Sequence, residues 1–209
     1  MNLNMQSDNM SRTRIGIMGG TFDPIHYGHL VIAEAAWYTF SLDKVIFIPA
    51  GSPPHKRNSH STAAPARAEM VALAIASNQH FDLSLIEVER SGFSYSVDTV
   101  AAIAQEYHNE ADIYFITGAD AVLDIGTWRQ PERLLSMCRF VAATRPGFDL
   151  AKLEKLPAPW RNKIDVMEIP GLDISSTDIR FRVQEERPIK YLLPEAVEEY
   201  IYKYRLYRQ

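Results

Sequence analysis

The sequence predicts an α/β fold, with a doubly wound and mainly parallel sheet in a single domain. Short apolar runs alternate with helical patterns along nearly the whole chain, and such alternation is typical of strands joined by crossover helices. Residues 44–49 (KVIFIP) are almost continuously apolar, which favours a strand covered on both faces. The 209 residues, 46% of them hydrophobic, are enough to bury one core.

The first half of the chain is expected to contain three strands, each followed by a helix. In chain order these elements are a strand at 14–18, a helix at 29–40, a strand at 44–49, a helix at 65–76, a strand at 81–88 and a helix at 96–107. The helix at 65–76 begins with a proline, which suits the first helical turn because its missing N–H would have no partner there.

The second half repeats this pattern and closes with helices. We expect a strand at 112–117, a helix at 131–137, strands at 139–144 and 164–169, and helices at 175–184 and 194–206. Residues 146–163 contain prolines and lack clear periodicity, but their length does not require a domain boundary. We therefore expect one domain at 13–209 behind a disordered polar tail at 1–12. The last helix carries tyrosines that we assign to packing.

The composition excludes several classes of protein. The formal net charge is -4, so there is no basic excess to indicate a nucleic-acid partner. Cys138 is the one cysteine, which excludes an internal disulfide and a cysteine-based zinc cluster and favours a small buried apolar residue. The first residues lack the apolar core of a secretory signal, and no run approaches the length of a membrane span. We expect a cytoplasmic protein without membrane contact, and the sequence leaves its oligomeric state open.

Two glycines follow the first predicted strand directly, in GGTFDPIHYGHL at residues 19–30. Gly19 and Gly20 let the backbone approach a ligand closely, with N–H groups free to face phosphate oxygens. Gly28 lies between two histidines and leaves space beside them. The segment therefore indicates a phosphate-binding turn between a strand and a helix.

His26 and His29 stand three residues apart at the start of the next predicted helix, so both imidazoles should lie on one side of its first turn. A helix N-terminus already favours anions, and two imidazole donors add to it. Taken singly, each histidine could be a turn residue or a helix cap. A zinc site is disfavoured because the usual helical pair is four residues apart and no acidic third ligand is near. Neither G-x-G-x-x-G nor a P-loop motif is present.

A second hydroxyl-rich helix start lies at residues 174–180, ISSTDIR. Serine and threonine can cap this helix while its N–H groups face phosphate. Arg180 lies within the first turns and is able to reach the same anion. By itself the segment could be an ordinary capped helix with a surface arginine, but it accompanies the first motif.

Both motifs resemble signatures of the nucleotidyltransferase superfamily that shares H-x-G-H with class I aminoacyl-tRNA synthetases. Further matches over residues 14–206 are similar to bacterial nicotinate mononucleotide adenylyltransferases. They are Pro53-Pro54-His55-Lys56, the segment 94–99 (SYSVDT), Gly118-Ala119-Asp120, Trp128 and Thr144-Arg145-Pro146-Gly147. Serine replaces the commoner threonine at positions 94 and 96, and the hydroxyl is retained.

The resemblance implies a Rossmann-like fold and an activity. The enzyme would transfer the AMP of ATP to nicotinate mononucleotide, giving nicotinate adenine dinucleotide and pyrophosphate in NAD biosynthesis. Mg²⁺ would be carried by the ATP phosphates, with no protein metal site. His26, His29 and Arg180 would be catalytic, acting on the ATP phosphates.

The resemblance also divides the other site residues between the two substrates. ATP would contact Gly19, Gly20, Thr21, Phe22, Gly28, Gly118, Ile174, Ser175, Ser176 and Thr177. Lys56 would meet phosphates, Tyr95 and Ser96 would touch the nicotinate ring, Asp120 would hold the ribose, Trp128 would stack on the pyridine, and Arg145 would lie near the mononucleotide. The N–H groups of the helix start at residues 96–99 would favour the acid over the amide.

The motifs support one another geometrically, because each falls where a predicted strand ends. In an open parallel sheet those ends share one edge, where ligands bind. Simpler explanations exist for single residues: Trp128 could be core, Asp120 a helix cap, and Lys56 part of a solvated loop. Rival functions are an adenylyltransferase acting on phosphopantetheine, which commonly has threonine at position 26, and a nucleotide-sensing or tRNA-binding module. The intact phosphate motifs and the lack of a basic RNA surface oppose the second rival.

Overall fold

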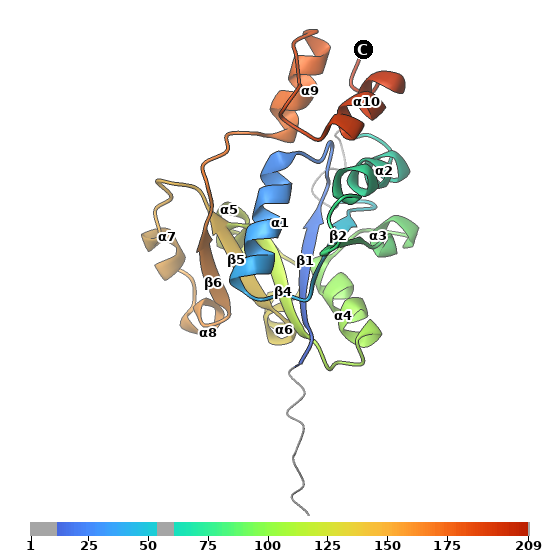
Figure 1. The fold of residues 1–209 in the computed structure, drawn as a ribbon. Coiled ribbons are helices and arrows are strands. Elements are labelled where there is room, and N and C mark those ends of the chain that lie inside the picture. Colours follow the sequence, from blue (N-terminus) through green and yellow to red (C-terminus); the bar gives the residue numbers. More distant parts are fainter. Residues whose placement is uncertain (1–11, 54–60, 209) are drawn as a thin grey trace, which may run out of the picture.

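The computed structural model describes residues 12–53 and 61–208, and within these ranges a parallel sheet forms the centre of the molecule. Its strands follow the order β3-β2-β1-β4-β5-β6, and every neighbouring pair is parallel (Figure 1). Their bounds are β1 Arg14–Gly20, β2 Lys44–Pro49, β3 Phe81–Leu83, β4 Asp112–Gly118, β5 Arg139–Thr144 and β6 Ile164–Glu168. The predicted doubly wound sheet is confirmed.

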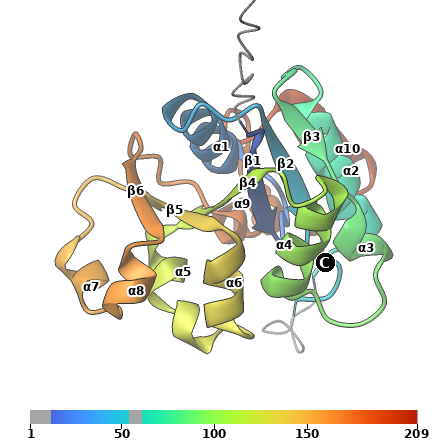
Figure 2. The same ribbon diagram turned by 90° about the horizontal axis from the view of Figure 1, so that it is seen from below.

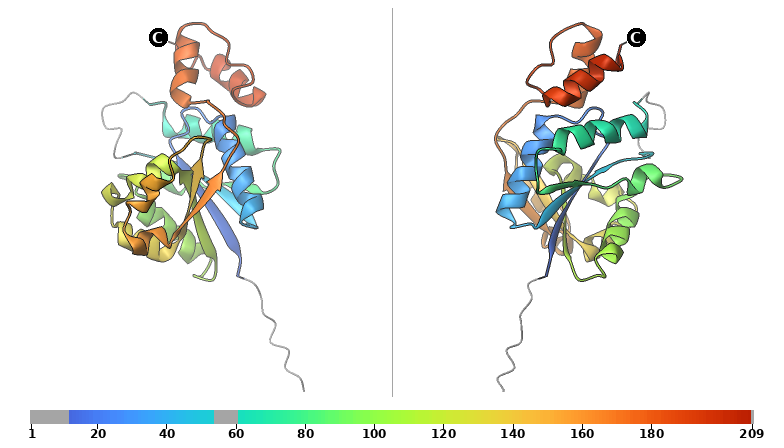
Figure 3. Two further views of the ribbon diagram at one scale, coloured as in Figure 1. Left: turned by 90° about the vertical axis from the view of Figure 1, so that its left-hand side faces the viewer. Right: turned by 45° about the vertical axis from the view of Figure 1, so that its right-hand side comes forward.

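Helices cover both faces of the sheet. One face carries α1 (Tyr27–Thr39) and α2 (Ala64–Ile75), and the other carries α4 (Ser96–Glu106), α5 (Ala119–Leu123) and α6 (Pro131–Met137), as Figure 2 shows from below. Helices α9 (Ser176–Gln184) and α10 (Glu195–Lys203) lie together beyond the carboxyl ends of the central strands (Figure 3). The remaining short helices are α3 (Ile86–Glu89), η2 (Ile125–Thr127), α7 (Ala151–Glu154) and α8 (Ala158–Arg161).

The apolar pattern of β2 explains the two-sided core. Val45 and Phe47 point into one apolar cluster, with α1, α2, α9 and α10, whereas Ile46 and Ile48 point into the other, with α4, α5 and α6. Successive side chains of a strand alternate between faces, so a continuous apolar run is what a strand between two helical layers requires. Cys138 is buried in the second cluster, as predicted.

The strand predicted at residues 81–88 is wrong beyond residue 83. Pairing of β3 with β2 ends near Leu83, and residues 86–89 form a helical turn instead. The turn brings the Glu87 backbone against the loop after β2, where a Cβ at Gly51 would lie 1.9 Å from the Glu87 carbonyl oxygen. Tertiary packing against a glycine therefore overrides the local apolar pattern.

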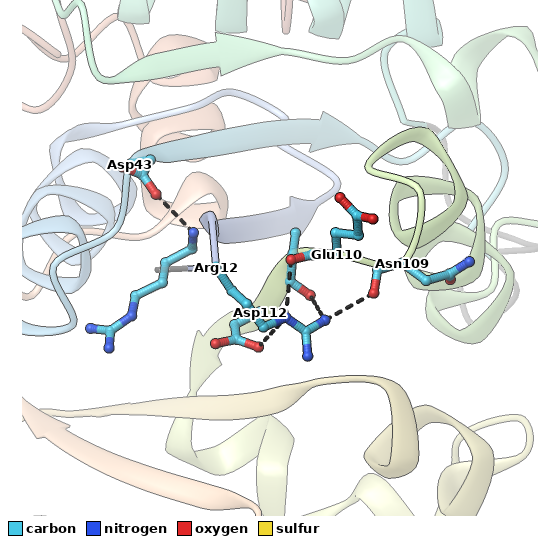
Figure 4. Close-up of polar contacts among 7 residues, drawn as sticks. Arg12, Asp43, Asn109, Glu110 and Asp112 are labelled. Carbon is cyan, nitrogen blue, oxygen red and sulfur yellow. Dashed lines mark hydrogen bonds and ion pairs between the residues drawn. The ribbon is translucent and has the colours of Figure 1, made fainter. Parts of the chain in front are cut away.

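The amino end of the sheet is fixed at the opposite end from α9 and α10. The Arg12 guanidinium donates to the carbonyl oxygens of residues 109, 110 and 111 at 2.9–3.2 Å and lies 3.3 Å from the Asp112 carboxylate (Figure 4). The Arg14 N–H donates to Asp43 at 2.8 Å. Apart from Arg12, the tail predicted at 1–12 lies outside the described residues. In the described part of the chain, no helix is long and apolar enough to cross a membrane.

Candidate active site

Two adjoining cavities open at the carboxyl ends of the strands, and Gly19 and Thr117 line both. The larger has a volume of about 700 Å³ and the smaller about 310 Å³. Gly19 and Thr117 each lie one residue before the end of their strand, β1 and β4, and the strand order reverses between these two strands. Such a switch point is where open α/β sheets bind ligands. We call the two cavities the larger and the smaller chamber.

The smaller chamber brings together the two predicted phosphate motifs. Residues of both motifs line it, together with Gly118 and Arg145; the motif residues are Gly19, His26, Gly28, His29, Ile174, Ser175 and Ser176. Stretches about 150 residues apart in the sequence thus face one cavity. Among the described residues that line it there is no carboxylate, and its polar side chains are imidazoles, hydroxyls and a guanidinium, all of which can donate a hydrogen bond.

The histidine pair is a stacked unit at the start of α1. His26 is the N-cap residue, and its ring lies 3.8 Å from the ring of His29, centroid to centroid, with the planes 28° apart. The predicted placement of both rings on one side of the first turn is confirmed. The backbone N–H of His26 donates to Nδ1 of the His29 ring at 3.2 Å. A neutral His29 therefore carries its proton on Nε2, where it can donate to a ligand.

Burial keeps both imidazoles neutral at pH 7. It lowers the pKa of His26 to about 4, with the charge of Arg145 adding to the effect. Burial and the neighbouring His26 lower the pKa of His29 well below its usual value. The buried Nδ1 of His26 has no hydrogen-bond partner in the described part of the chain. This atom faces the backbone of the first turn of α1, where a Cβ at Gly28 would lie 2.9 Å from it.

A glycine is needed at position 28 because the His26 ring packs against it. From the sequence alone, the missing side chain was expected to leave space for phosphates. A Cβ at Gly28 would lie 2.9 Å from Cε1 and Nδ1 of His26 and 3.7 Å from the Ile174 carbonyl oxygen. Gly20 has a similar role, because a Cβ there would lie 2.9 Å from the Phe22 ring. Both glycines therefore allow rings to pack beside the backbone.

The second motif begins α9 as predicted, with Ser175 as the N-cap residue accepting the Asp178 N–H at 3.1 Å. Ser176 Oγ donates to the Pro24 carbonyl oxygen at 2.9 Å, which joins the second motif to the first. Arg180 donates to the Asp23 carbonyl oxygen at 2.7 Å and lies outside the lining of either chamber, as does Thr177.

The larger chamber is lined by the residues predicted to contact the pyridine ring. Tyr95, Ser96 and Trp128 line it, and Trp128 packs edge-on against Phe115 with ring centroids 5.8 Å apart. The guanidinium of Arg129 lies 4.5 Å above the Tyr95 ring and also lines the chamber. Its lining is thus aromatic, with a cation at the rim.

A buried carboxyl group in the larger chamber was missed from the sequence. Glu87 lines the cavity at 7% exposure and accepts a hydrogen bond from Thr99 at 2.6 Å. Burial raises its pKa, against the opposing effect of hydrogen bonds from Thr99 and Ser94. The sequence concealed this group because residues 81–88 had the pattern of a strand.

Several predicted residues lie apart from the expected subsite. Arg145 lines the smaller chamber with the histidines and lies 3.5 Å from Asp173. Asp120 is exposed in the first turn of α5 and lines neither chamber. Phe22 is 2% exposed and packs beneath His29, so only its backbone can reach a ligand. Lys56 lies outside the described residues. Gly20 and Thr21 line the larger chamber.

Arg67 is the second buried charged residue near the site that was missed from the sequence. It is 1% exposed, and its guanidinium donates to the carbonyl oxygens of Thr21, Ala50 and Thr62 at 2.5, 2.6 and 2.9 Å. It thereby joins the loops that follow β1 and β2. The available signal was an arginine on the buried stripe of α2, four residues before the buried Val71.

Comparisons with known proteins agree with this architecture. The chain matches the cytidylyltransferase-like family over residues 17–182. It is 59% identical to a probable nicotinate-nucleotide adenylyltransferase of Moorella thermoacetica, covering 93% of this chain and 92% of the relative. It is 54% identical to another from Thermoanaerobacter sp., covering 94% and 95%. Its fold is similar to that of Plasmodium falciparum nicotinic acid mononucleotide adenylyltransferase complexed with NaAD, with a TM-score of 0.77 and 25% identity over 93% of this chain and 97% of that one.

Proposed function

The chain belongs to the cytidylyltransferase-like family and, within it, to the nicotinate-nucleotide adenylyltransferases, and from this premise we propose that its two chambers divide the two substrates. The enzyme transfers the AMP moiety of ATP to nicotinate mononucleotide, giving nicotinate adenine dinucleotide and pyrophosphate in NAD biosynthesis. The smaller chamber binds ATP and the larger binds the mononucleotide.

The contrast between the two linings carries this assignment. The smaller chamber presents imidazoles, Arg145 and a helix start at Ser175 and Ser176, which are groups that bind phosphate oxygens. The larger presents Tyr95, Trp128 and other apolar groups, which suit a planar ring. The chambers meet at Gly19 and Thr117, so the reacting phosphates meet there.

The reaction is an in-line displacement at the α-phosphorus of ATP. An oxygen of the mononucleotide 5′-phosphate forms the new bond, the bond to the bridging oxygen of the β-phosphate breaks, and pyrophosphate leaves. The attacking phosphate is already an anion at neutral pH, so the site needs no general base. His26 and His29, which line the smaller chamber, stabilise charge on the ATP phosphates, and the surrounding loops hold the two phosphates in line. We propose the same role for Arg180, whose guanidinium lies outside the chamber lining on the Asp23 carbonyl oxygen.

Mg²⁺ is proposed as the counter-ion that the triphosphate brings with it. In the described part of the chain, no three acidic, histidine or cysteine side chains cluster as metal ligands. A donor-lined chamber without a carboxylate fits an ion held mainly by phosphate oxygens and water. When bound, the ion would neutralise part of the charge on the leaving pyrophosphate.

The remaining roles follow from placement. We propose that Arg145 contacts phosphates in the smaller chamber, Asp120 the mononucleotide ribose, and Lys56, beyond the described residues, the phosphates from the loop after β2. We also propose that the partners are small molecules alone and that the enzyme works in the cytoplasm, where ATP is available.

An ATP–pyrophosphate exchange assay with a panel of acceptors tests the proposal. Nicotinate mononucleotide should support exchange strongly, and nicotinamide mononucleotide should give a lower kcat/KM because its NH₂ donors would meet donors at the start of α4. Omitting Mg²⁺ should abolish exchange. Exchange with phosphopantetheine, and none with either pyridine mononucleotide, would assign the chain to a different acceptor.

A further inference from the structure

The segment between β1 and the histidine pair is held from both sides by buried charged groups. On one side, the Arg67 guanidinium donates to the Thr21 carbonyl oxygen at 2.5 Å. On the other, the carboxylate of Asp23, 3% exposed, accepts hydrogen bonds from the Tyr207 hydroxyl at 2.8 Å and the Thr62 N–H at 3.2 Å. Tyr207 lies 184 residues further along the chain, in the segment after α10, which Figures 1 and 3 place beside α9.

Phe22, in the held segment, and Tyr207, which contacts it, both adopt an unfavourable backbone conformation. Phe22 has φ 49° and Tyr207 has φ 63°, both in the left-handed region that disfavours residues with a side chain. Such conformations persist where the surroundings over-determine them. Phe22 is fixed between the anchored Thr21 and Asp23, and Tyr207 by its hydroxyl. Burial and the Asp23 carboxylate raise the pKa of Tyr207, so it remains a donor.

The anchored segment contacts two groups assigned to the ATP phosphates. The Phe22 ring lies edge-on to the His29 ring with centroids 5.0 Å apart. The Asp23 carbonyl oxygen accepts from Arg180 at 2.7 Å. A shift of Asp23 would therefore move the support of His29 and the acceptor of Arg180 together.

We propose that Tyr207 is a positioning residue for the phosphate site, holding Phe22 beneath His29 and the Asp23 carbonyl against Arg180 through its hydrogen bond to the Asp23 carboxylate. This inference rests on the proposed assignment of His29 and Arg180 to the ATP phosphates. If Tyr207 served only to anchor its own segment, removing its hydroxyl would lower stability and leave turnover per folded molecule unchanged.

The substitution Tyr207→Phe removes one oxygen, and Tyr204→Phe is the matched control, because Tyr204 is 54% exposed in the same segment. We expect Tyr207→Phe to lower kcat about three- to tenfold, the effect of one lost hydrogen bond, and to leave the KM for nicotinate mononucleotide within about twofold. Tyr204→Phe should match the wild type.

Coupling to Asp23 tests the route. If Tyr207 acts through the carboxylate, Asp23→Ala, which removes the acceptor, should lower kcat at least as much, and the double variant should lose much less than the product of the two single losses. Independent, multiplying losses would overturn the proposal. So would an unchanged kcat in Tyr207→Phe, whether or not Asp23→Ala folds.

The imidazole resonances of His29, measured by NMR without substrate, give a readout that does not depend on activity. Tyr207→Phe should shift them, and Tyr204→Phe should not. A wild type that makes no dinucleotide while Tyr207→Phe still shifts His29 would refute the proposed function and leave the positioning link standing. Unmoved His29 resonances in Tyr207→Phe would overturn the link itself.

Discussion

Lowering the pH from 7 to 5 should remove about 2 kcal/mol of folding free energy through His26 alone. The folded-state pKa of His26 is about 4, against an ordinary value of 6.5. Between these two values the unfolded chain binds a proton at His26 that the folded chain does not. The free energy of unfolding therefore falls as the pH falls below 6.5, and this loss is nearly absent at pH 7.

The magnitude depends on the surroundings of the ring. His26 is 6% exposed, stacked on His29 and close to the charge of Arg145. Burial removes water that would solvate an imidazolium, and Arg145 repels it, so both effects act in the same direction. No described carboxylate lines this chamber to offset them.

Urea unfolding of the ligand-free protein at pH 7 and pH 5 measures the effect, with His26→Asn as the comparison. Asparagine is favoured at a helix N-cap, so the variant should fold, and it has no group that titrates in this range. Its loss on acidification should be smaller than that of the wild type by about 2 kcal/mol. Removing His26 also removes its lowering effect on the pKa of His29. The variant then loses less stability through His29 on acidification, which increases the difference between the two proteins. Equal losses in the two proteins would refute the reasoning, because His26 would then titrate normally in the folded state.

Three further predictions concern the two chambers. His29→Ala should lower kcat by about 10²–10³ with little change in melting temperature, since one donor to developing charge is lost. A near-normal kcat would show that His29 takes no part in the reaction. Gly28→Ala should lower kcat at least about tenfold by displacing the His26 ring, while stability falls by only about 0–2 kcal/mol because better helix propensity offsets part of the clash; a crystal structure with an unmoved ring would contradict this. Trp128→Ala should raise the KM for nicotinate mononucleotide about tenfold through lost stacking and leave the KM for ATP unchanged. A selective rise in the KM for ATP would show that the substrates are assigned to the wrong chambers.

The centre of the sheet could be predicted from the sequence because β1, β2 and β5 are buried along most of their length. Runs such as 44–49 need no context to be recognised, and the alternation of these runs with helical patterns predicts crossover helices between parallel strands. The error at 81–88 arose where local pattern and tertiary packing disagree, since the chain forms a helical turn whose Glu87 backbone packs against Gly51. The short helices α7 and α8 were missed because four residues are too few to show a period.

The candidate site was predictable where its residues form a compact motif. The stacking of His26 on His29 and the cap at Ser175 follow from spacing and helix geometry. Arg67 and Tyr207 could not be found this way, because they act on backbone carbonyls or on Asp23 from distant parts of the chain. Their role depends on which loops the fold brings together, and no local pattern records that.

In its described lining, the smaller chamber of the free protein carries one permanent positive charge and two neutral imidazoles. Arg145 supplies a permanent charge at an exposed position near Asp173, whereas the two buried imidazoles are neutral in the free protein because of their lowered pKa values. His29 can still serve a phosphate while neutral, because its Nδ1 accepts from the backbone N–H of His26 and its proton on Nε2 is left to donate. The protein therefore avoids the cost of burying two imidazolium ions, and the smaller chamber offers phosphates the permanent charge of Arg145 together with neutral donors.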